Sequence, residues 1–472
     1  MNRRDFIKAV GLGAASFLAS GCSRGAGAGA NAGRRSRKPN FVFILIDDLG
    51  WKDLGFMGSR YYETPRIDKL AAEGVVFTSA YSNAPNCAPT RACLMSGQYG
   101  PRHGVYTVGT PQRGPSQRRK LIPTPNTTEL ATKHVTLAEA LKSAGYTCAC
   151  LGKWHLGSKA PFRPQDRGFD VTYERHGRGH FTADGQYLTD RLTDEAVEFI
   201  KANRDKPFFV YLSHHAVHTP IQAKPELVAK YEKKPPVGGH NHPAYAAMIE
   251  SVDQSVGRVL DKLDELNLSD DTVVFFFSDN GGHANFTSIE PLRGSKGTLY
   301  EGGIRVPAII RAPDARASGR RCDVPIIGLD FYPTMLALAG VPQPGGHILD
   351  GESIVPLLSG TGTLARDAIF WHFPAYLEPY NDGQWPWRTT PAGAMRQGDW
   401  KLIEFFEGRR VELYNLRDDI GETKDLAARL PEKAKEMRAR LSDWRDKVKA
   451  PVPTRLNPEF NPQSLRRNPQ DN

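Results

Sequence analysis

Two uninterrupted apolar runs, each ending in acidic residues, constrain the fold more than any other feature of this sequence. They are residues 41–46 (FVFILI), followed by Asp47 and Asp48, and residues 272–277 (TVVFFF), followed by Ser278, Asp279 and Asn280. Runs without polar alternation are typical of parallel strands that are covered on both faces. Polar residues just past the ends of such strands lie where open α/β sheets bind their ligands.

A third strand and a long helix extend this pattern. Residues 208–212 (FFVYL) form another apolar run, and residues 243–266 carry apolar side chains at helical spacing. Alternation of helices and buried strands favours helices packed on both faces of a sheet. The sequence therefore predicts an α/β/α sandwich around a large, mostly parallel sheet, which we assign to residues 39–360.

The pattern changes beyond that boundary. Strands at 401–406 and 410–414 flank a Glu-Gly pair, which predicts a hairpin, and an amphipathic helix follows at 431–448. These elements predict a small α+β domain over residues 361–450, with an antiparallel sheet and a helix. Residues 451–472 are rich in Pro, Asn and Arg, and we expect an irregular tail there.

The N-terminus carries a targeting signal rather than part of the fold. Arg3 and Arg4 resemble a twin-arginine export signal, and the apolar stretch after them is too short for a strong membrane span. The string Leu-Ala-Ser-Gly-Cys, ending at Cys22, resembles a lipoprotein cleavage box. The alternative is an ordinary signal cleaved near Ala30. We expect a signal at 1–22, a tether at 23–38, and export by the twin-arginine machinery to the bacterial periplasm or to a lipid anchor at Cys22.

Composition points to an anionic partner. The chain has 62 Lys and Arg residues against 52 Asp and Glu residues, a formal net charge of +10, which favours nucleic acid, a membrane surface or an acidic substrate. A solubilising surface is the alternative. No nucleic-acid module is recognisable, so we expect no nucleic-acid partner and favour an anionic polysaccharide. The six cysteines include no CxxC pair, which argues against zinc ribbons and thioredoxin-like sites.

The densest chemical signal is the string PNCAPTRACLMSG at residues 85–97. A strand is expected at 75–79 and a short helix at 90–96, with Pro89 in its first turn. Cys87 then lies beside a helix N-terminus, where free N–H groups favour anions, and Arg91 offers a fork for a tetrahedral oxyanion. A lone cysteine is usually a small buried hydrophobic residue, but the complete string makes that interpretation poor.

This string resembles the signature of the formylglycine-dependent, arylsulfatase-like (type I) sulfatases of the alkaline phosphatase-like superfamily. Four further segments resemble motifs of the same family: 145–157, 216–220, 292–307 and 412–426. Together the similarities cover about residues 38–426, and several ordered motifs are far stronger than one. The resemblance implies a sulfuric ester hydrolase.

The resemblance also implies a modified residue and a metal. In this family the motif cysteine, here Cys87, is converted to Cα-formylglycine by a formylglycine-generating enzyme. Asp47, Asp48, Asp279 and Asn280, with residue 87, would hold a divalent cation, usually calcium. Hard oxygen ligands suit calcium or magnesium independently of the resemblance. The alternative is that these residues form turns, but adjacent carboxylates repel each other without a cation.

Catalytic roles follow from the resemblance residue by residue. One hydroxyl of the hydrated formylglycine at 87 would attack sulfur. Arg91, Lys153 and Lys296 would bind the sulfate oxygens. His218, with Lys296, would protonate the departing alcohol, and His155 would accept the proton that restores the aldehyde. Lys153 and His155 are two residues apart, which places them on one side of an extended segment. An exposed lysine or an ordinary hydrogen-bonded histidine is a credible alternative for each of these residues alone, but a weak explanation for all of them together.

Other polar residues have two interpretations each. His103 is a substrate contact or loop packing, and we favour packing. Residues 174–180, which include Arg175, His176 and His180, line a pocket for a sulfated sugar or form an exposed loop. His372 lies at a substrate rim or in domain packing, and His214 and His215 are expected to be supporting or structural residues.

Three functions remain open from the sequence. The leading one is hydrolysis of sulfate esters on glycans or small molecules. A phosphonate or phosphodiester hydrolase of the same superfamily is the second, because its nucleophile motif is shared. The third is a non-catalytic lipoprotein that binds sulfated glycans, although every expected catalytic position is filled. The sequence does not specify the sugar, the hydroxyl or the mode of attack.

Overall fold

The computed structural model describes residues 38–175, 179–313, 319–360, 362–380 and 387–465. The chain divides into two units, Met1–Arg37 and Lys38–Asn472, and the description below concerns the second. The predicted signal at 1–22, the candidate lipid site Cys22 and almost all of the tether lie outside the described residues. Among the residues described, no helix is both long and apolar enough to cross a membrane.

An eight-stranded sheet in the order β5-β4-β6-β1-β7-β8-β2-β9 forms the centre of the molecule. Its strands are β1 (Asn40–Ile46), β2 (Val75–Phe77), β4 (Thr147–Gly152), β5 (Val171–Tyr173), β6 (Phe208–Ser213), β7 (Thr272–Ser278), β8 (Ala308–Arg311) and β9 (Arg320–Cys322). All neighbours are parallel except β8, which runs antiparallel to β7 and β2. The mostly parallel sheet predicted from the apolar runs is confirmed. A separate pair, β3 (Ala80–Tyr81) and β10 (Ile326–Ile327), is also parallel.

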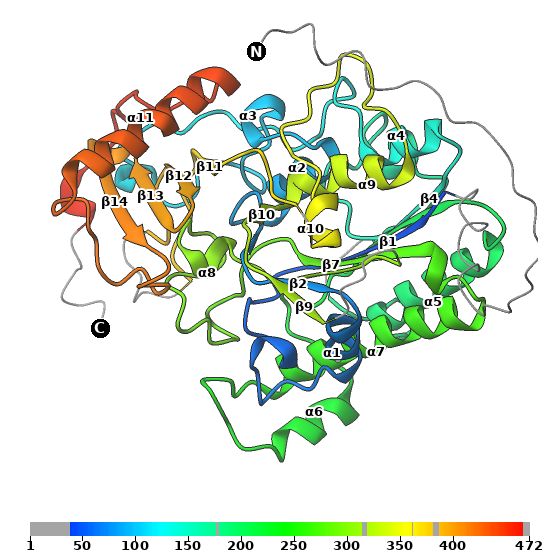
Figure 1. Ribbon diagram of the computed structural model, residues 1–472. Helices are drawn as coiled ribbons and strands as arrows, with labels where there is room; N and C mark the ends of the chain where they lie inside the picture. The colour runs from blue at the N-terminus through cyan, green and yellow to red at the C-terminus, as the bar shows by residue number, and fades with distance from the viewer. Residues whose placement is uncertain (1–37, 176–178, 314–318, 361, 381–386, 466–472) are drawn as a thin grey trace, which may run out of the picture. The chain divides into compact units, whose positions relative to one another are not determined.

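Helices cover both faces of this sheet (Figure 1). One face packs against α2 (Cys87–Ser96), α4 (Leu137–Ser143) and α9 (Phe331–Ala339), and the other against α1 (Pro65–Glu73), α5 (Leu188–Ala202) and α7 (Pro243–Glu265). In β1, Phe41, Phe43 and Leu45 point into the first core, while the residues between them point into the second. Because both faces are buried, the strand is apolar throughout.

The remaining helices are short or peripheral. They are α3 (Gly100–His103), α6 (Pro225–Glu232), α8 (Glu301–Ile304) and α10 (Val355–Ser359). The sequence placed the start of the signature helix at residue 90, but α2 begins at Cys87. The side chain of Asn86 accepts the Cys87 N–H at 2.9 Å and caps the helix three residues earlier than expected.

A four-stranded antiparallel sheet forms the C-terminal part, as predicted. Its strands are β11 (Ala368–Phe373), β12 (Ala392–Gln397), β13 (Trp400–Phe405) and β14 (Arg410–Asn415), and α11 (Pro431–Val448) packs on it. Trp371 is buried, and its indole N–H donates to the Ser82 carbonyl oxygen at 2.8 Å. His372 is also buried, and its Nε2 lies 3.0 Å from the Pro451 carbonyl oxygen. Both residues therefore pack the two parts together rather than forming a substrate rim.

The described end of the chain returns to the loop after α3. Leu456 forms an isolated bridge with Leu121, and the Asn457 N–H donates to the Lys120 carbonyl at 3.0 Å. Apart from the short 3₁₀ turn Pro462–Leu465, residues 451–465 are irregular. The boundaries at 360 and 450 stay predictions.

Candidate active site

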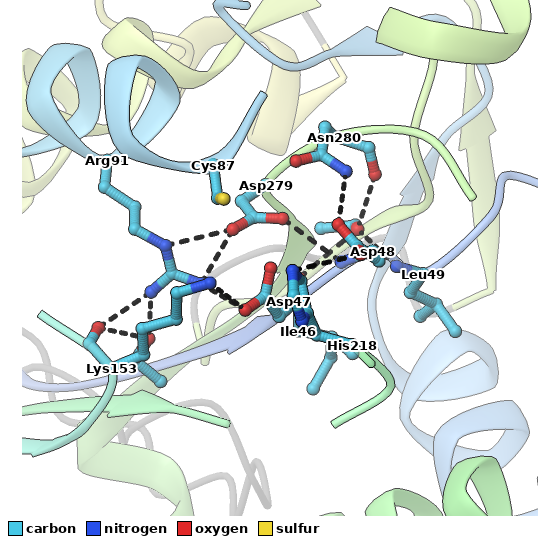
Figure 2. Close-up of polar contacts among 12 residues, drawn as sticks. Ile46, Asp47, Asp48, Leu49, Cys87, Arg91, Lys153, His218, Asp279 and Asn280 are labelled. Carbon is cyan, nitrogen blue, oxygen red and sulfur yellow. Dashed lines mark hydrogen bonds and ion pairs between the residues drawn. The ribbon is translucent and has the colours of Figure 1, made fainter. Parts of the chain in front are cut away.

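Four polar residues meet at the ends of the two central strands. Asp47 and Asp48 follow β1, and Asp279 and Asn280 follow β7, which is paired in register so that Ile46 lies opposite Ser278. The Asp48 N–H donates to Asp279 Oδ1 at 3.2 Å, and Asn280 Nδ2 donates to Asp48 Oδ1 at 2.8 Å (Figure 2). All four residues are buried, so the charges of the three aspartates interact strongly.

Cys87 points into this group from the first turn of α2. Figure 2 shows its thiol directed toward the carboxylates of Asp47 and Asp279, and one potential ligand atom from each of the three lies within 4.8 Å of the others. The side chain is 2% exposed. Burial raises the pKa of the Cys87 thiol, although Lys153 and Lys296 oppose the shift. The unmodified thiol is therefore protonated at neutral pH.

Arg91 differs from the sequence prediction. It is fully buried and does not line the cavity described below. Its Nε and Nη2 donate to Asp279 Oδ2 at 3.0 and 2.7 Å, and Nη1 donates to the Lys153 carbonyl oxygen at 2.8 Å. Its fork is thus occupied by a carboxylate and a backbone carbonyl of this chain. Arg91 holds Asp279 and the Lys153 segment in place instead of offering a fork to a ligand.

Two lysines donate to the acidic group, each to a different aspartate. Lys153 donates to Asp47 Oδ2, and Lys296 donates to Asp48 Oδ2 at 2.6 Å. Burial favours the neutral amine, but the carboxylates outweigh it and raise the pKa of both lysines. Gly152, directly before Lys153, has a φ of 108°. A Cβ there would lie 1.9 Å from the Ser213 carbonyl oxygen, so the turn that leads into Lys153 requires glycine.

The acidic group has unsatisfied oxygens. Asp47 Oδ1 and Asn280 Oδ1 are buried and have no hydrogen-bond partner in the part of the chain that the structure describes. Burial and the neighbouring Asp47 raise the pKa of Asp279 to about 7, against the effect of Arg91. Buried oxygens without partners, and a carboxyl group whose pKa is raised to about 7, are expected where a bound cation would supply the compensating positive charge. The oxygen-only donors suit calcium or magnesium.

His218 and His155 stand at the edge of this group. His218 Nδ1 donates to the Thr219 carbonyl oxygen at 2.7 Å, and its Nε2 lies 3.7 Å from Asp48 Oδ2. His155 has a φ of 64°, so the segment from Lys153 is not extended there, contrary to the sequence expectation. Both residues nevertheless line the same cavity. Burial, with Lys153 and Arg91, lowers the pKa of His155 well below its usual value, and its imidazole is neutral.

These residues open into a cavity of about 780 Å³. Five of the six proposed catalytic residues line it, all except Arg91. Its lining comprises Asp47, Asn86, Cys87, Val108, Arg113, Lys153, His155, Gly179, His180, His215, His218, Thr219, Pro220, His283, Lys296, Tyr380 and Arg388. A cavity of this size accommodates a ligand considerably larger than a sulfate group.

A comparison with known families decides what this constellation is. The family model for sulfatases matches residues 39–341, which is more than half of the chain. This chain belongs to the sulfatase family. A second model, the C-terminal part of N-sulphoglucosamine sulphohydrolase, matches residues 295–447. The family confirms the resemblance found in the motifs and identifies the chain as a sulfuric ester hydrolase.

Individual sulfatases match most of this chain. A sulfatase of Formosa agariphila is 34% identical over 88% of this chain and 90% of its own length. Human N-acetylgalactosamine-6-sulfatase is 32% identical over 83% of this chain and 79% of its own, and human steryl-sulfatase is 30% identical over 72% and 73%. The crystal structure of Ps i-CgsB gives a TM-score of 0.73 at 31% identity, over 86% of this chain and 93% of that one. The same protein has been solved in complex with k-i-k-neocarrahexaose.

Four further histidines that the sequence analysis considered separate into two groups. His180 and His215 line the cavity, and His180 Nε2 lies 2.8 Å from the His218 carbonyl oxygen. His103 and His214 do not line it: His103 Nε2 lies 3.4 Å from Cys93 Sγ, and His214 Nε2 lies 3.0 Å from Ser255 Oγ. The packing role favoured for His103 agrees with this geometry. Arg175 contacts the Gly179 carbonyl oxygen, and His176 lies outside the described residues.

Sequence reasoning missed four polar cavity residues: Arg113, His283, Tyr380 and Arg388. They come from loops outside every motif that the sequence analysis used. Tyr380 and Arg388 lie in the connection between β11 and β12, where length alone gives no signal of a site. The basic net charge is the feature that agrees with an arginine-bearing cavity.

Proposed function

We propose that this sulfatase hydrolyses sulfate esters carried by sugars, with residue 87, converted from cysteine to formylglycine, as its nucleophile. The observation that carries the proposal is the convergence of Cys87, three buried aspartates (Asp47, Asp48 and Asp279) and two charged lysines, which together we call the floor. Cys87, Asp47 and both lysines line the cavity. Converted residue 87 would supply a geminal hydroxyl as the attacking oxygen.

The cavity lining favours a sugar over a sterol. Relatives of both kinds occur, since N-acetylgalactosamine-6-sulfatase and steryl-sulfatase both match this chain. The aliphatic side chains in the lining are Val108 and Pro220, whereas charged, imidazole and amide groups make up most of it. A sterol requires extensive apolar contact, while a sulfated sugar exchanges its water for polar partners. The complex of Ps i-CgsB with a neocarrahexaose supports the same class.

The proposed cation site fits oxygen ligands of this chain. Asp47, Asp48, Asp279 and Asn280 would hold the ion, together with residue 87. The two buried oxygens that lack partners among the described residues, Asp47 Oδ1 and Asn280 Oδ1, would become ligands. When bound, calcium would lower the pKa of the nucleophilic hydroxyl and neutralise charge on a sulfate oxygen.

Lys153 and Lys296 would bind the sulfate group. Their ammonium groups stay charged because Asp47 and Asp48 stabilise the protonated form. Each amine is less than one-sixth exposed, so its attraction for an anion is screened weakly. The lysines would hold the ester at the floor and stabilise the charge that develops on its oxygens.

His218 and His155 would divide the proton transfers. The bond from His218 Nδ1 to the Thr219 carbonyl oxygen fixes the ring and leaves Nε2 facing the floor, where it would protonate the departing alcohol. Neutral His155 has a buried Nδ1 with no partner among the residues described, and it would accept a proton from residue 87. Arg91 would act as a positioning residue through Asp279 and the Lys153 backbone.

Hydrolysis assays test this function directly. The full chain, co-expressed with a formylglycine-generating enzyme and loaded with Ca²⁺, is assayed with 4-nitrophenyl sulfate, 4-nitrophenyl phosphate, sulfated oligosaccharides and a steryl sulfate. We expect sulfate release from one or more oligosaccharides at a higher kcat/KM than from the steryl ester. Faster cleavage of the phosphate would support the phosphorus hydrolase instead. Binding of oligosaccharides without any release would support the non-catalytic lipoprotein.

We also propose export of the folded enzyme through the twin-arginine machinery and attachment of lipid to Cys22. This rests on Arg3, Arg4 and the sequence before Cys22. Twin-arginine substrates cross the membrane folded, so the buried Cys87 would have to be converted before folding and export. Replacing both arginines with lysine should retain the protein in the cytoplasmic fraction. Replacing Cys22 with alanine should remove the lipid and shift the exported protein from the membrane fraction to the soluble periplasmic fraction.

A further inference from the structure

The cavity lining also contains groups that the proposed reaction does not use. Arg113, His283, Tyr380 and Arg388 line it together with the floor residues, but none of them contacts Asp47, Asp48 or Cys87 in the described structure. We call these four residues the rim. The cavity that they share with the floor is larger than one sulfate group, so an ester bound at Cys87 brings other parts of its sugar to the rim.

Arg388 is the rim arginine whose charge has no carboxylate partner among the residues described. It forms no ion pair with a carboxylate in the described residues, and its Nε is buried without a hydrogen-bond partner among them. Its guanidinium lies 3.7 Å from the centre of the Tyr380 ring. Arg113, by contrast, donates from Nε to Glu378 Oε2 at 2.9 Å. The charge of Arg113 is therefore matched, and that of Arg388 is available to a ligand.

The surroundings hold Arg388 in this position. Its backbone pairs with Leu377, and the Tyr380 hydroxyl donates to the Lys296 carbonyl oxygen at 3.1 Å. The Tyr380 ring also lies against His283, with ring centres 3.8 Å apart. Gly297, next to Lys296, has a φ of 93°, and a Cβ there would lie 2.8 Å from Arg388 Nε. Arg388 thus packs against the same turn that carries the sulfate-binding Lys296, which fixes its distance from the floor.

We propose that Arg388 binds a second anionic group of the substrate, a sulfate or a carboxylate carried in addition to the sulfate that is hydrolysed. The proposal rests on the proposed function, because it places the scissile ester at Cys87. A partly buried guanidinium without a carboxylate partner gains most from a bidentate anion. The substrate class is then a sugar or oligosaccharide with at least two anionic groups, and Arg388 is a specificity residue that takes no part in proton transfer.

Calorimetry on a Cys87→Ser variant tests this without hydrolysis. The variant, loaded with Ca²⁺, is titrated with a carrageenan-type disaccharide bearing one sulfate and with the same disaccharide bearing two. It is also titrated with a chondroitin-type disaccharide sulfated on its amino sugar, with the uronate carboxyl either intact or reduced to the alcohol. The first pair tests a second sulfate, and the second pair tests a carboxylate. We expect the additional anion to tighten binding at least fivefold in one pair.

Arg388→Gln, introduced into the same variant, should abolish this gain and leave the affinity for the singly charged ligand within about twofold. The matched control is Arg293→Gln. Arg293 also stacks on a tyrosine, 4.0 Å from the Tyr300 ring centre, but it does not line the cavity. The control should retain the gain.

The outcomes separate the two proposals. If the extra anion gives no gain in either pair, or if Arg388→Gln retains the full gain, the role of Arg388 is overturned while the sulfatase reaction stands. Equal loss of affinity for every ligand in Arg388→Gln overturns it as well, because a specificity residue acts on one group of the substrate. Failure of the Cys87→Ser variant to bind any of the four ligands contradicts the sugar class of the proposed function itself.

Discussion

The floor and the rim of the cavity are built in opposite ways. Most floor residues come from the ends of β1, β4 and β7 and from the first turn of α2, whereas Lys296 comes from the loop between β7 and α8. Almost every charge there has a partner of opposite sign. Rim residues come from loops, and Arg388 has no carboxylate partner among the residues described. A site whose charges are fixed by strand ends suits chemistry that is the same for every substrate. An arginine on a loop suits the part of the substrate that varies.

Among changes to floor and rim residues, loss of the nucleophile should lower activity the most. Cys87→Ala should lower kcat for sulfate release at least about 1,000-fold, because the attacking group is removed. Its melting temperature should stay close to that of the wild type, since alanine is compatible with the first turn of α2. The measurement is sulfate release under saturating substrate. A variant retaining more than a tenth of the wild-type rate would show that another group attacks sulfur.

Removal of calcium should have the next largest effect. Dialysis against a calcium chelator leaves three buried carboxylates to repel each other, so activity should fall about 100-fold and the melting temperature should drop. Added Ca²⁺ should restore both quantities. Asn280→Ala should weaken the response to Ca²⁺ in a titration followed by melting temperature. An untouched melting temperature after complete chelation would contradict the proposed cation site.

Lys296→Ala tests the contribution of one floor lysine. It removes a cation from the sulfate and leaves Asp48 without its ion-pair partner at 2.6 Å, so kcat/KM should fall about 100-fold. The matched control is Lys142→Ala. Lys142 pairs with Asp170 at 2.6 Å but is half exposed, so its replacement should change kcat/KM less than twofold. Similar losses in both variants would mean that Lys296 supports the fold rather than the sulfate.

A buried ionic group outside the cavity, where α8 meets the C-terminal sheet, provides a pH-dependent prediction. Lys401, on β13, pairs with Glu301 at 2.9 Å and with Glu422 at 2.8 Å, and all three are fully buried. Burial raises the pKa of Glu422 to about 7, helped by Glu301 and opposed by Lys401. The folded state therefore binds the Glu422 proton more tightly than the unfolded state does. This contribution to stability is complete below about pH 4.5 and is lost as the pH rises through 7.

Glu422→Gln removes that proton equilibrium. Between pH 4.5 and 7.5 the free energy of unfolding of the variant should rise relative to wild type by about 1–3 kcal/mol. Denaturant titrations across this range measure it. Glu432→Gln, at an exposed position on α11, should give a difference that does not change with pH. A constant difference for Glu422→Gln too would show that folding leaves the pKa of Glu422 unchanged.

Most of the floor could be predicted from the sequence because its residues adjoin strong local patterns. Asp47 and Asp279 each follow an apolar strand, and parallel strands place their ends at one edge of the sheet. Cys87, Lys153 and Lys296 belong to segments that resemble family motifs. The sheet, the helices on both faces and the C-terminal hairpin followed from the same periodic signals.

The failures have physical reasons. Arg91 was expected to face the ligand, but in the structure it donates to Asp279 Oδ2 at 2.7 Å. Sequence spacing does not show which carboxylate a buried guanidinium will contact. The turn at His155 depends on a positive φ, which the local sequence does not predict. Arg388 reaches the cavity through packing of the β11–β12 connection against Gly297, a contact between segments about ninety residues apart. Such contacts are set by tertiary packing, which no local pattern encodes.

The mass of the peptide that contains Cys87 tests the central claim most directly. The full chain, purified in active form after co-expression with a formylglycine-generating enzyme, is digested, and the peptide is weighed. Conversion of the thiol to the aldehyde makes the peptide lighter by about 18 Da. We predict this shift, and we predict that sulfate-releasing activity rises in proportion to the converted fraction. Full sulfate-releasing activity in a preparation whose Cys87 peptide retains the unmodified thiol would contradict the account.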